Sequence, residues 1–271
     1  MTPRSIAWFD GHWGEPQQLE LPLSDRGLQL ADGLFETVLV LHGQPKLLEA
    51  HLQRWQRSAE LLDMAPPPEA SALQPLIEEA IRRAELPQGS GALRLNWSRG
   101  DSSGRGIELP DPAAPHRFWL QLSPHRPSFS PQTAIVSRQE RRNRNSLLSR
   151  CKTFAYGQAI QARLEARRAG ADEALLLASG GELCCGTTAN LLIQRRGQWL
   201  TPALSSGCLP GVMRAQLLSR GLAKEADLSP EPQPGDSWLL INSLGCRPLS
   251  RVDHHALELH PSAEALWRSL L

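Results

Sequence analysis

The stretch GELCCGTTANLLI, residues 181–193, combines a loop of glycine and hydroxyl residues with the apolar run that follows it. Backbone N–H groups in such a loop can cradle a phosphate, and the hydroxyls of Thr187 and Thr188 can add hydrogen bonds to it. The apolar runs Ala174–Leu177 and Asn190–Gln194 predict strands on either side of the Gly180-Gly181 turn. The stretch therefore predicts a loop that can hold a phosphate.

A second loop suited to an anion is CLPGVMR, residues 208–214. Proline is tolerated in the first turn of a helix, so Pro210-Gly211 predicts a helix start, where unpaired backbone N–H groups attract negative charge. Two such loops in one half of the chain indicate a ligand that carries a phosphate.

Lys152 is the residue best suited to react with such a ligand if the ligand is also an aldehyde. The 29 Lys and Arg residues include only three lysines, at positions 46, 152 and 224, and a guanidinium cannot form an imine. Nearby cations disfavour a protonated amine, and Lys152 follows Arg138, Arg141, Arg142, Arg144 and Arg150. A solvated basic face explains this cluster equally well. The two loops favour a reactive lysine that binds a phosphorylated aldehyde cofactor.

Apolar periodicity predicts helices and strands mixed along the chain, in two domains. The expected strands are Ile6–Phe9, Leu34–Leu41, Leu93–Trp97 and Ala134–Ser137, and the expected helices are Leu48–Leu62, Ala72–Leu86, about Lys152 to Arg168, and three that start near Pro210, Pro230 and Pro261. The stretch 122–133 has three prolines among small polar residues, which is typical of a semi-rigid linker. It predicts a small N-terminal α/β domain, 1–121, and a larger C-terminal cofactor-binding domain, 134–271.

Composition restricts the partners to small molecules. A net charge of +1 argues against nucleic-acid binding, and no apolar run approaches the roughly 20 residues that span a bilayer. The N-terminus, MTPRSIAWFDG, lacks the pattern of a secretory signal, so we expect a cytoplasmic protein. Five cysteines, including the adjacent Cys184 and Cys185 but no C-x-x-C, predict reduced thiols and no metal site.

Six stretches occur here in the order typical of the class IV aminotransferases, and the chain resembles that family of fold-type IV pyridoxal-phosphate enzymes. They are SDRGLQLADGLFET (24–37), HLQRW (51–55), SRGDSSGRG (98–106), Lys152 followed by AGADEALLL (169–177), CCGTTANLL (184–192) and CLPGVMR (208–214). The resemblance implies a two-domain α/β (α+β) fold that binds pyridoxal 5'-phosphate between its domains, and a homodimer.

The resemblance also implies roles for single residues. Lys152 would bind the cofactor as a Schiff base and move the proton at the substrate Cα, and Arg54 would bind the phosphate. The rest of the phosphate site would be Thr187, Thr188 and the backbone of Val212 and Met213, supported by Glu173 and Asn190. Arg105 is a candidate for bidentate binding of a substrate carboxylate. A solvated loop arginine is an equally good interpretation of Arg105.

One position departs from the family pattern. The family places a glutamate five residues before the loop asparagine, where its carboxylate keeps the pyridine nitrogen protonated and the ring a strong electron sink. Counting back from Asn190, that position is Cys185. Glu182 would face the opposite side of a strand, and a neutral thiol cannot hold a pyridinium as a carboxylate does. A gap in the alignment that hides the glutamate is the alternative.

Three features favour the aminodeoxychorismate lyases of the family over its aminotransferases. They are Met213 where aminotransferases have a threonine, the adjacent cysteines, and Thr37, which could protonate the leaving enolpyruvyl group or could simply be a β-branched strand residue. A lyase that forms 4-aminobenzoate for folate synthesis suits a weak electron sink, because the expelled group carries the electrons away. A branched-chain or D-amino-acid aminotransferase remains an alternative, as does a relative that binds the cofactor without catalysis.

Overall fold

The computed structural model describes residues 3–102, 104, 106–111 and 114–271. The chain forms two compact units. Unit 1 comprises Met1–Arg126 and Cys151–Ala155, and unit 2 comprises Pro127–Arg150 and Tyr156–Leu271. The chain first passes from one unit to the other after Arg126, within the stretch predicted as a linker, although a strand occupies the start of that stretch up to Pro124.

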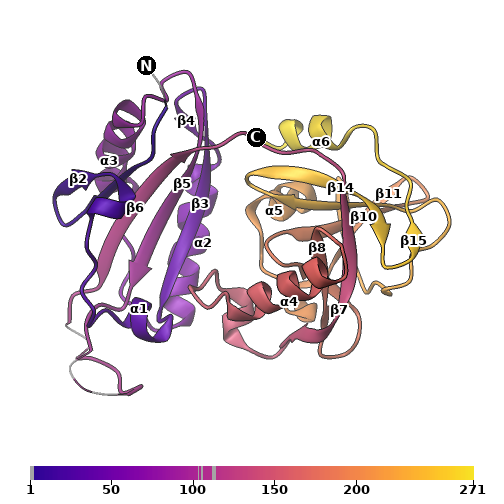
Figure 1. Ribbon diagram of the computed structural model, residues 1–271, viewed down its shortest axis with the longest axis horizontal. Helices are drawn as coiled ribbons and strands as arrows, with labels where there is room; N and C mark the ends of the chain where they lie inside the picture. Colours follow the sequence, from indigo (N-terminus) through magenta and orange to yellow (C-terminus); the bar gives the residue numbers. More distant parts are fainter. Residues whose placement is uncertain (1–2, 103, 105, 112–113) are drawn as a thin grey trace. The chain divides into compact units, whose positions relative to one another are not determined.

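Unit 1 is built on a six-stranded sheet in the order β2-β1-β6-β5-β3-β4 (Figure 1). Its strands are β1 (Ile6–Phe9), β2 (His12–Gly14), β3 (Gly33–Leu41), β4 (Gln44–Pro45), β5 (Ser90–Ser98) and β6 (Arg117–Pro124). Both hairpin turns, at Asp10-Gly11 and His42-Gly43, have positive φ at both residues. Such a turn matches the twist of the strands that it joins, and glycine relieves its backbone strain.

The helices of unit 1 are the 3-10 helix η1 (Pro16–Gln18), α1 (Arg26–Leu30), α2 (Leu48–Leu61) and α3 (Ala70–Arg83). Of these, α2 and α3 pack on one face of the sheet and share one apolar core with it. The apolar positions of α2 recur at helical spacing, as the sequence predicts, and pack Trp55 and Ala59 against Leu34 and Val38 of β3. Residues of β3 alternate between the two faces of the sheet, so Phe35 and Thr37 lie on the face opposite these helices.

Segment 151–155 differs from its sequence prediction. The predicted helix from Lys152 was wrong at its start, because α4 begins at Gly157. Instead the segment pairs with β3: Phe35 N–H donates to Lys152 O at 2.9 Å, and Phe154 N–H donates to Gly33 O at 3.0 Å. These long-range backbone bonds place the segment in unit 1, whereas the sequence assigned it to the C-terminal domain.

Unit 2 contains a nine-stranded sheet. Its strands are β7 (Gln132–Arg142), β8 (Glu173–Ala178), β9 (Leu183–Gly186), β10 (Asn190–Arg195), β11 (Gln198–Pro202), β12 (Ala223–Ala226), β13 (Ser237–Asn242), β14 (Gly245–Val252) and β15 (His255–Ala256). The strand β9 pairs with β8 on one side and with β10 on the other, which closes β10, β13, β14, β7, β8 and β9 into a ring. The phosphate-suited loop GTTA lies at this closure.

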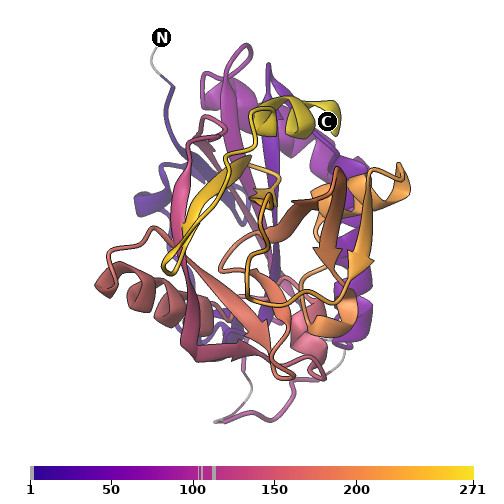
Figure 2. The same cartoon turned by 90° about the vertical axis from the view of Figure 1, so that its right-hand side faces the viewer.

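The helices of unit 2 pack around that ring. They are α4 (Gly157–Arg168), α5 (Val212–Ser219) and α6 (Ala263–Ser269), with the short 3-10 helices η2 (Leu147–Arg150) and η3 (Leu204–Ser206). Figure 2 shows α4, which packs on β7 and β8. The predicted helices near Pro210 and Pro261 are confirmed, but the one near Pro230 was wrong, because β13 follows that turn. No helix among the described residues is long and apolar enough to cross a membrane.

Candidate active site

Lys152 lies beside β3, with its amine on the face of the unit 1 sheet that carries Phe35. Its backbone is fixed by the hydrogen bond from Phe35 N–H, and its Nζ lies 4.3 Å from the centroid of the Phe35 ring. Gly33 lies under the Phe154 ring, where an added Cβ would come within 2.3 Å of a ring carbon. Backbone pairing therefore fixes the Lys152 backbone relative to β3, and its amine lies over the Phe35 ring.

Arg94 of β5 is a candidate site residue that the sequence interpretation missed. It pairs directly across the sheet with Thr37, so the two side chains lie on the same face. Its Cζ lies 3.6 Å from the centroid of the Phe35 ring, and its Nε donates to Asn96 Oδ1 at 2.7 Å. The sequence did contain a signal for Arg94. It lies between Leu93 and Leu95, which are buried, so strand alternation places its side chain on the other face of the sheet.

Arg54, the predicted phosphate-binding arginine, forms a buried ion pair on the helix-covered face. Its Nε and Nη2 donate to the two carboxylate oxygens of Glu36, at 2.8 and 2.5 Å. His51, one turn earlier in α2, lies 2.7 Å through its Nδ1 from Glu36 Oε2. All three residues are buried. Two guanidinium nitrogens of Arg54 are thus already hydrogen-bonded, and its contact with a phosphate stays a prediction.

The charges in this cluster are set by burial and pairing. Burial alone would raise the pKa of Glu36, but the Arg54 charge and the His51 hydrogen bond lower it to about 2. Burial lowers the pKa of His51, and the Arg54 and Lys152 charges act in the same direction, against the hydrogen bond and charge of Glu36. At neutral pH Glu36 is therefore an anion and His51 is neutral. Because the Glu36 carboxylate can only accept a hydrogen bond, the neutral His51 ring carries its proton on Nδ1 and donates a hydrogen bond from it to Glu36.

In unit 2 the structure brings the two phosphate-suited loops together. Gly186 N–H donates to Ala189 O at 2.9 Å, which closes the turn between β9 and β10. The next residue, Asn190, donates from Nδ2 to Leu209 O at 2.9 Å. A Cβ on Gly211 would lie 1.9 Å from Asn190 Oδ1, so only glycine fits there. Asn190 therefore joins the turn to the start of α5.

The start of α5 has backbone donors available for an anion. Gly211 is the N-cap and α5 begins at Val212, so the N–H groups of Val212 and Met213 have no acceptor within the helix. The side chains of Val212 and Met213 are buried, so the predicted use of their backbone in phosphate binding stays a prediction. Thr188 is exposed, and its N–H and hydroxyl have no hydrogen-bond partner in the described part of the chain.

Thr187 differs from its expected role as a hydroxyl donor to phosphate. Its hydroxyl lies 2.6 Å from Glu173 Oε1 and accepts from Arg163 Nη2, also at 2.6 Å. Its N–H donates to the same Glu173 oxygen at 3.4 Å. A hydroxyl can donate only one hydrogen bond, and that of Thr187 donates to Glu173. Thr187 therefore supports the turn in this structure. A contact of the Thr188 hydroxyl with a phosphate stays a prediction.

Cys185 lies directly opposite Asn190 where β9 pairs with β10. Glu182 is not a substitute for the missing glutamate, because its carboxylate pairs with Arg144 at 3.2 Å. A hydrogen bond to Cys184 and burial raise the pKa of the Cys185 thiol, so the thiol stays protonated. All five cysteines lie in the described residues and are buried thiols without disulfides.

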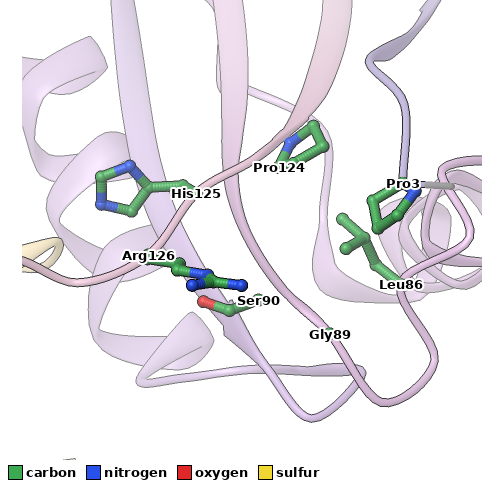
Figure 3. Close-up of a pocket in the computed structure, with 7 residues that line it drawn as sticks. All are labelled: Pro3, Leu86, Gly89, Ser90, Pro124, His125 and Arg126. Atoms are coloured by element: carbon green, nitrogen blue, oxygen red, sulfur yellow. The ribbon is translucent and has the colours of Figure 1, made fainter.

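Two other features lie apart from these residues. A hollow in unit 1 has a volume of about 340 Å³. None of the predicted site residues lines it; its lining residues, drawn in Figure 3, are Pro3, Leu86, Gly89, Ser90, Pro124, His125 and Arg126. Among the described residues, no group of His, Cys, Asp or Glu is arranged to hold a metal ion. Arg105, the predicted carboxylate ligand, lies outside the described residues.

Comparisons with known proteins agree with the fold. The family model for amino-transferase class IV matches residues 33–252. A Schizosaccharomyces pombe protein, named provisionally as an aminodeoxychorismate lyase, is 29% identical over 218 residues, which are 78% of this chain and 85% of its own length. The Bacillus subtilis aminodeoxychorismate lyase is 25% identical over 210 residues, 77% of this chain and 71% of its own length.

Other relatives are aminotransferases. They include a branched-chain enzyme, named provisionally, from Methanocaldococcus jannaschii and a D-alanine aminotransferase from Bacillus licheniformis, 25% and 24% identical. The Escherichia coli branched-chain aminotransferase structure matches with a TM-score of 0.83 over 98% of this chain and 93% of that chain, at 22% identity. These matches confirm the predicted α/β fold.

Proposed function

Because the chain belongs to the amino-transferase class IV family, we propose that it is a 4-amino-4-deoxychorismate lyase, which releases pyruvate and forms 4-aminobenzoate for folate synthesis. Pyridoxal 5'-phosphate is the cofactor of this family. The proposal of lyase activity is supported by the relatives from Schizosaccharomyces pombe and Bacillus subtilis, whose names carry it. Relatives named as aminotransferases make transamination the competing activity.

The residues present fit this cofactor. Its phosphate requires several N–H and O–H donors, and the start of α5 together with Thr188 has donors that nothing in the described chain occupies. The close approach of Gly211 to Asn190 keeps these two elements adjacent. Its aldehyde requires an amine on a fixed backbone, which Lys152 provides. When bound, the cofactor is an electron sink for the carbon that carries the substrate amine.

The observation that carries the proposal is the set of groups on one face of β3 and its neighbours. Lys152, Thr37 and Arg94 are an amine, a hydroxyl and a guanidinium, all adjacent to the Phe35 ring or paired across from each other. Lys152 removes the proton from the substrate carbon bearing nitrogen. Thr37 gives a proton to the departing enolpyruvyl group, and Arg94 binds a substrate carboxylate.

Cys185 supports elimination over transamination. We place its neutral thiol at the pyridine nitrogen, where it neither carries a negative charge nor holds a proton as a carboxylate would. Elimination tolerates a weak electron sink because the leaving group removes the electrons and the product becomes aromatic. Transamination has no leaving group and must return a proton to the cofactor carbon.

The proposed substrate also fits the charges of the chain. It is a small molecule with two carboxylates, for which Arg94 and Arg105 are the proposed partners.

We further propose that the enzyme is a cytoplasmic homodimer. The exposed apolar side chains of Leu23 and Ile107, 82% and 84% accessible, would then be available to a partner subunit.

The test compares two reactions of the purified holoenzyme. Pyruvate and 4-aminobenzoate are quantified from 4-amino-4-deoxychorismate, and conversion of the cofactor to its amine form is followed with D-alanine, L-glutamate and L-leucine. We expect the two elimination products in equal amounts and slow conversion by every amino acid. Faster turnover of any amino acid than release of pyruvate would replace the lyase with an aminotransferase. Binding of cofactor without either reaction would indicate a relative that has lost catalysis.

A further inference from the structure

Arg163 in α4 connects the start of β8 to the tip of the β9–β10 turn. Its Nη2 forms an ion pair with the Glu173 carboxylate and donates to Thr187 Oγ1 at 2.6 Å. The Thr187 hydroxyl closes the triangle by donating to Glu173 Oε1. The Glu173 side chain is 4% exposed and that of Arg163 is 42% exposed. No family motif in the sequence pointed to Arg163.

The triangle controls both the position and the charge of the turn. The hydrogen bond from Gly186 N–H to Ala189 O closes the turn. The hydroxyl and the N–H of Thr187 attach the turn to Glu173. A buried carboxylate without a counter-charge is costly, and it would repel any anion bound at the neighbouring Thr188. Arg163 neutralises Glu173 and holds Thr187 to it at the same time.

We propose that Arg163 is a positioning residue for phosphate binding. It acts through Glu173 and Thr187, and it does not touch the cofactor. The proposal rests on the proposed role of the Thr188 turn in binding the phosphate of pyridoxal 5'-phosphate. It follows that removal of Arg163 weakens the binding of a phosphorylated ligand and leaves the binding of its unphosphorylated analogue unchanged.

The experiment measures dissociation constants of pyridoxal 5'-phosphate and of pyridoxal for apoenzyme prepared from the holoenzyme. We expect Arg163→Met to weaken the phosphorylated cofactor about tenfold and to leave pyridoxal unchanged. Arg163→Lys keeps the positive charge and should recover most of the affinity. The matched control is Arg167→Met, which removes the same charge from an exposed position one turn along α4 and should change neither constant.

A double variant separates the charge of the triangle from its geometry. In Arg163→Met with Glu173→Gln the buried anion is gone, so we expect part of the phosphate affinity to return. Equal losses for pyridoxal and its phosphate, or no loss for either, would overturn the proposal. Pyruvate release is assayed separately on the unmodified enzyme, so a failure of the lyase assignment is distinguishable from a failure of this one.

Discussion

Cys185 and Asn190 are partners across the β9–β10 pair, at the two ends of the GTTA loop. We predict that Cys185→Glu shifts the enzyme from elimination toward transamination, because a carboxylate would keep the ring nitrogen protonated and deepen the electron sink. A tenfold change in the ratio of the two rates requires only about 1.4 kcal/mol. Cys184→Ser is the neighbouring control. An unchanged ratio in the glutamate variant would show that Cys185 does not contact the pyridine nitrogen.

Arg54 should matter more for cofactor affinity than Arg105. A charge-assisted hydrogen bond contributes roughly 1.5–3 kcal/mol, so Arg54→Ala should weaken pyridoxal 5'-phosphate by about tenfold or more, and Arg105→Ala should raise the KM for substrate instead. Equilibrium dialysis of the two variants measures the difference. Because Arg54 also pairs with buried Glu36, circular dichroism must first show that the variant is folded. Equal cofactor affinities would refute both assignments.

The Glu36 cluster predicts how stability depends on pH. The folded pKa of Glu36, about 2, is below its usual value of 4.5, so its stabilisation is present above pH 4.5 and is lost as the pH falls to about 2. The shift corresponds to roughly 3 kcal/mol. The lowered pKa of His51 adds a loss of stability that begins below pH 6.5, because the unfolded chain takes up that proton first.

Urea unfolding between pH 7 and pH 3 measures this dependence. The free energy of unfolding should decrease as the pH falls through both ranges, and Glu36→Gln should be less stable at neutral pH but should lose less stability than the native protein below pH 4.5. If the variant loses stability below pH 4.5 as steeply as the native protein, Glu36 is not the group responsible.

Thr37 should act on the rate of elimination and not on cofactor binding. A positioned proton donor typically contributes 10²–10⁴-fold, so Thr37→Val should slow pyruvate release about a hundredfold or more. Thr37→Ser retains a hydroxyl on the same strand and should keep most of the rate. The measurement is kcat for pyruvate release together with the dissociation constant of the cofactor. Full activity of the valine variant would leave Thr37 as an ordinary strand residue.

Local sequence patterns correctly predicted the helices and strands that depend mainly on interactions between residues close in sequence. The apolar runs Ile6–Phe9 and Leu34–Leu41, each followed by a turn, and the helical spacing from Leu48 predicted strands and a helix close to those observed. Lys152 was assigned to a helix because its pairing with β3 joins residues more than a hundred positions apart. Pro230 precedes a turn rather than a helix, since proline at a chain reversal has the same local signature.

The site shows the same division between local and long-range information. Loop composition predicted a helix start after Pro210-Gly211, which the structure confirms and which is a property of the local backbone, whereas phosphate binding there stays a prediction. It did not reveal that the Thr187 hydroxyl donates a hydrogen bond to Glu173, or that Arg94 lies across from Thr37. Both depend on strand register and on helix packing, which a single sequence does not specify.

The most direct test of the account is to find which lysine binds the cofactor. The chain has lysines only at positions 46, 152 and 224, so reduction of the holoenzyme with borohydride followed by peptide mapping gives an unambiguous answer. The account predicts one pyridoxyl-modified peptide, containing Lys152, and loss of the yellow absorption on reduction. Modification of Lys46 or Lys224, or a colourless protein that added cofactor cannot reconstitute, would contradict it.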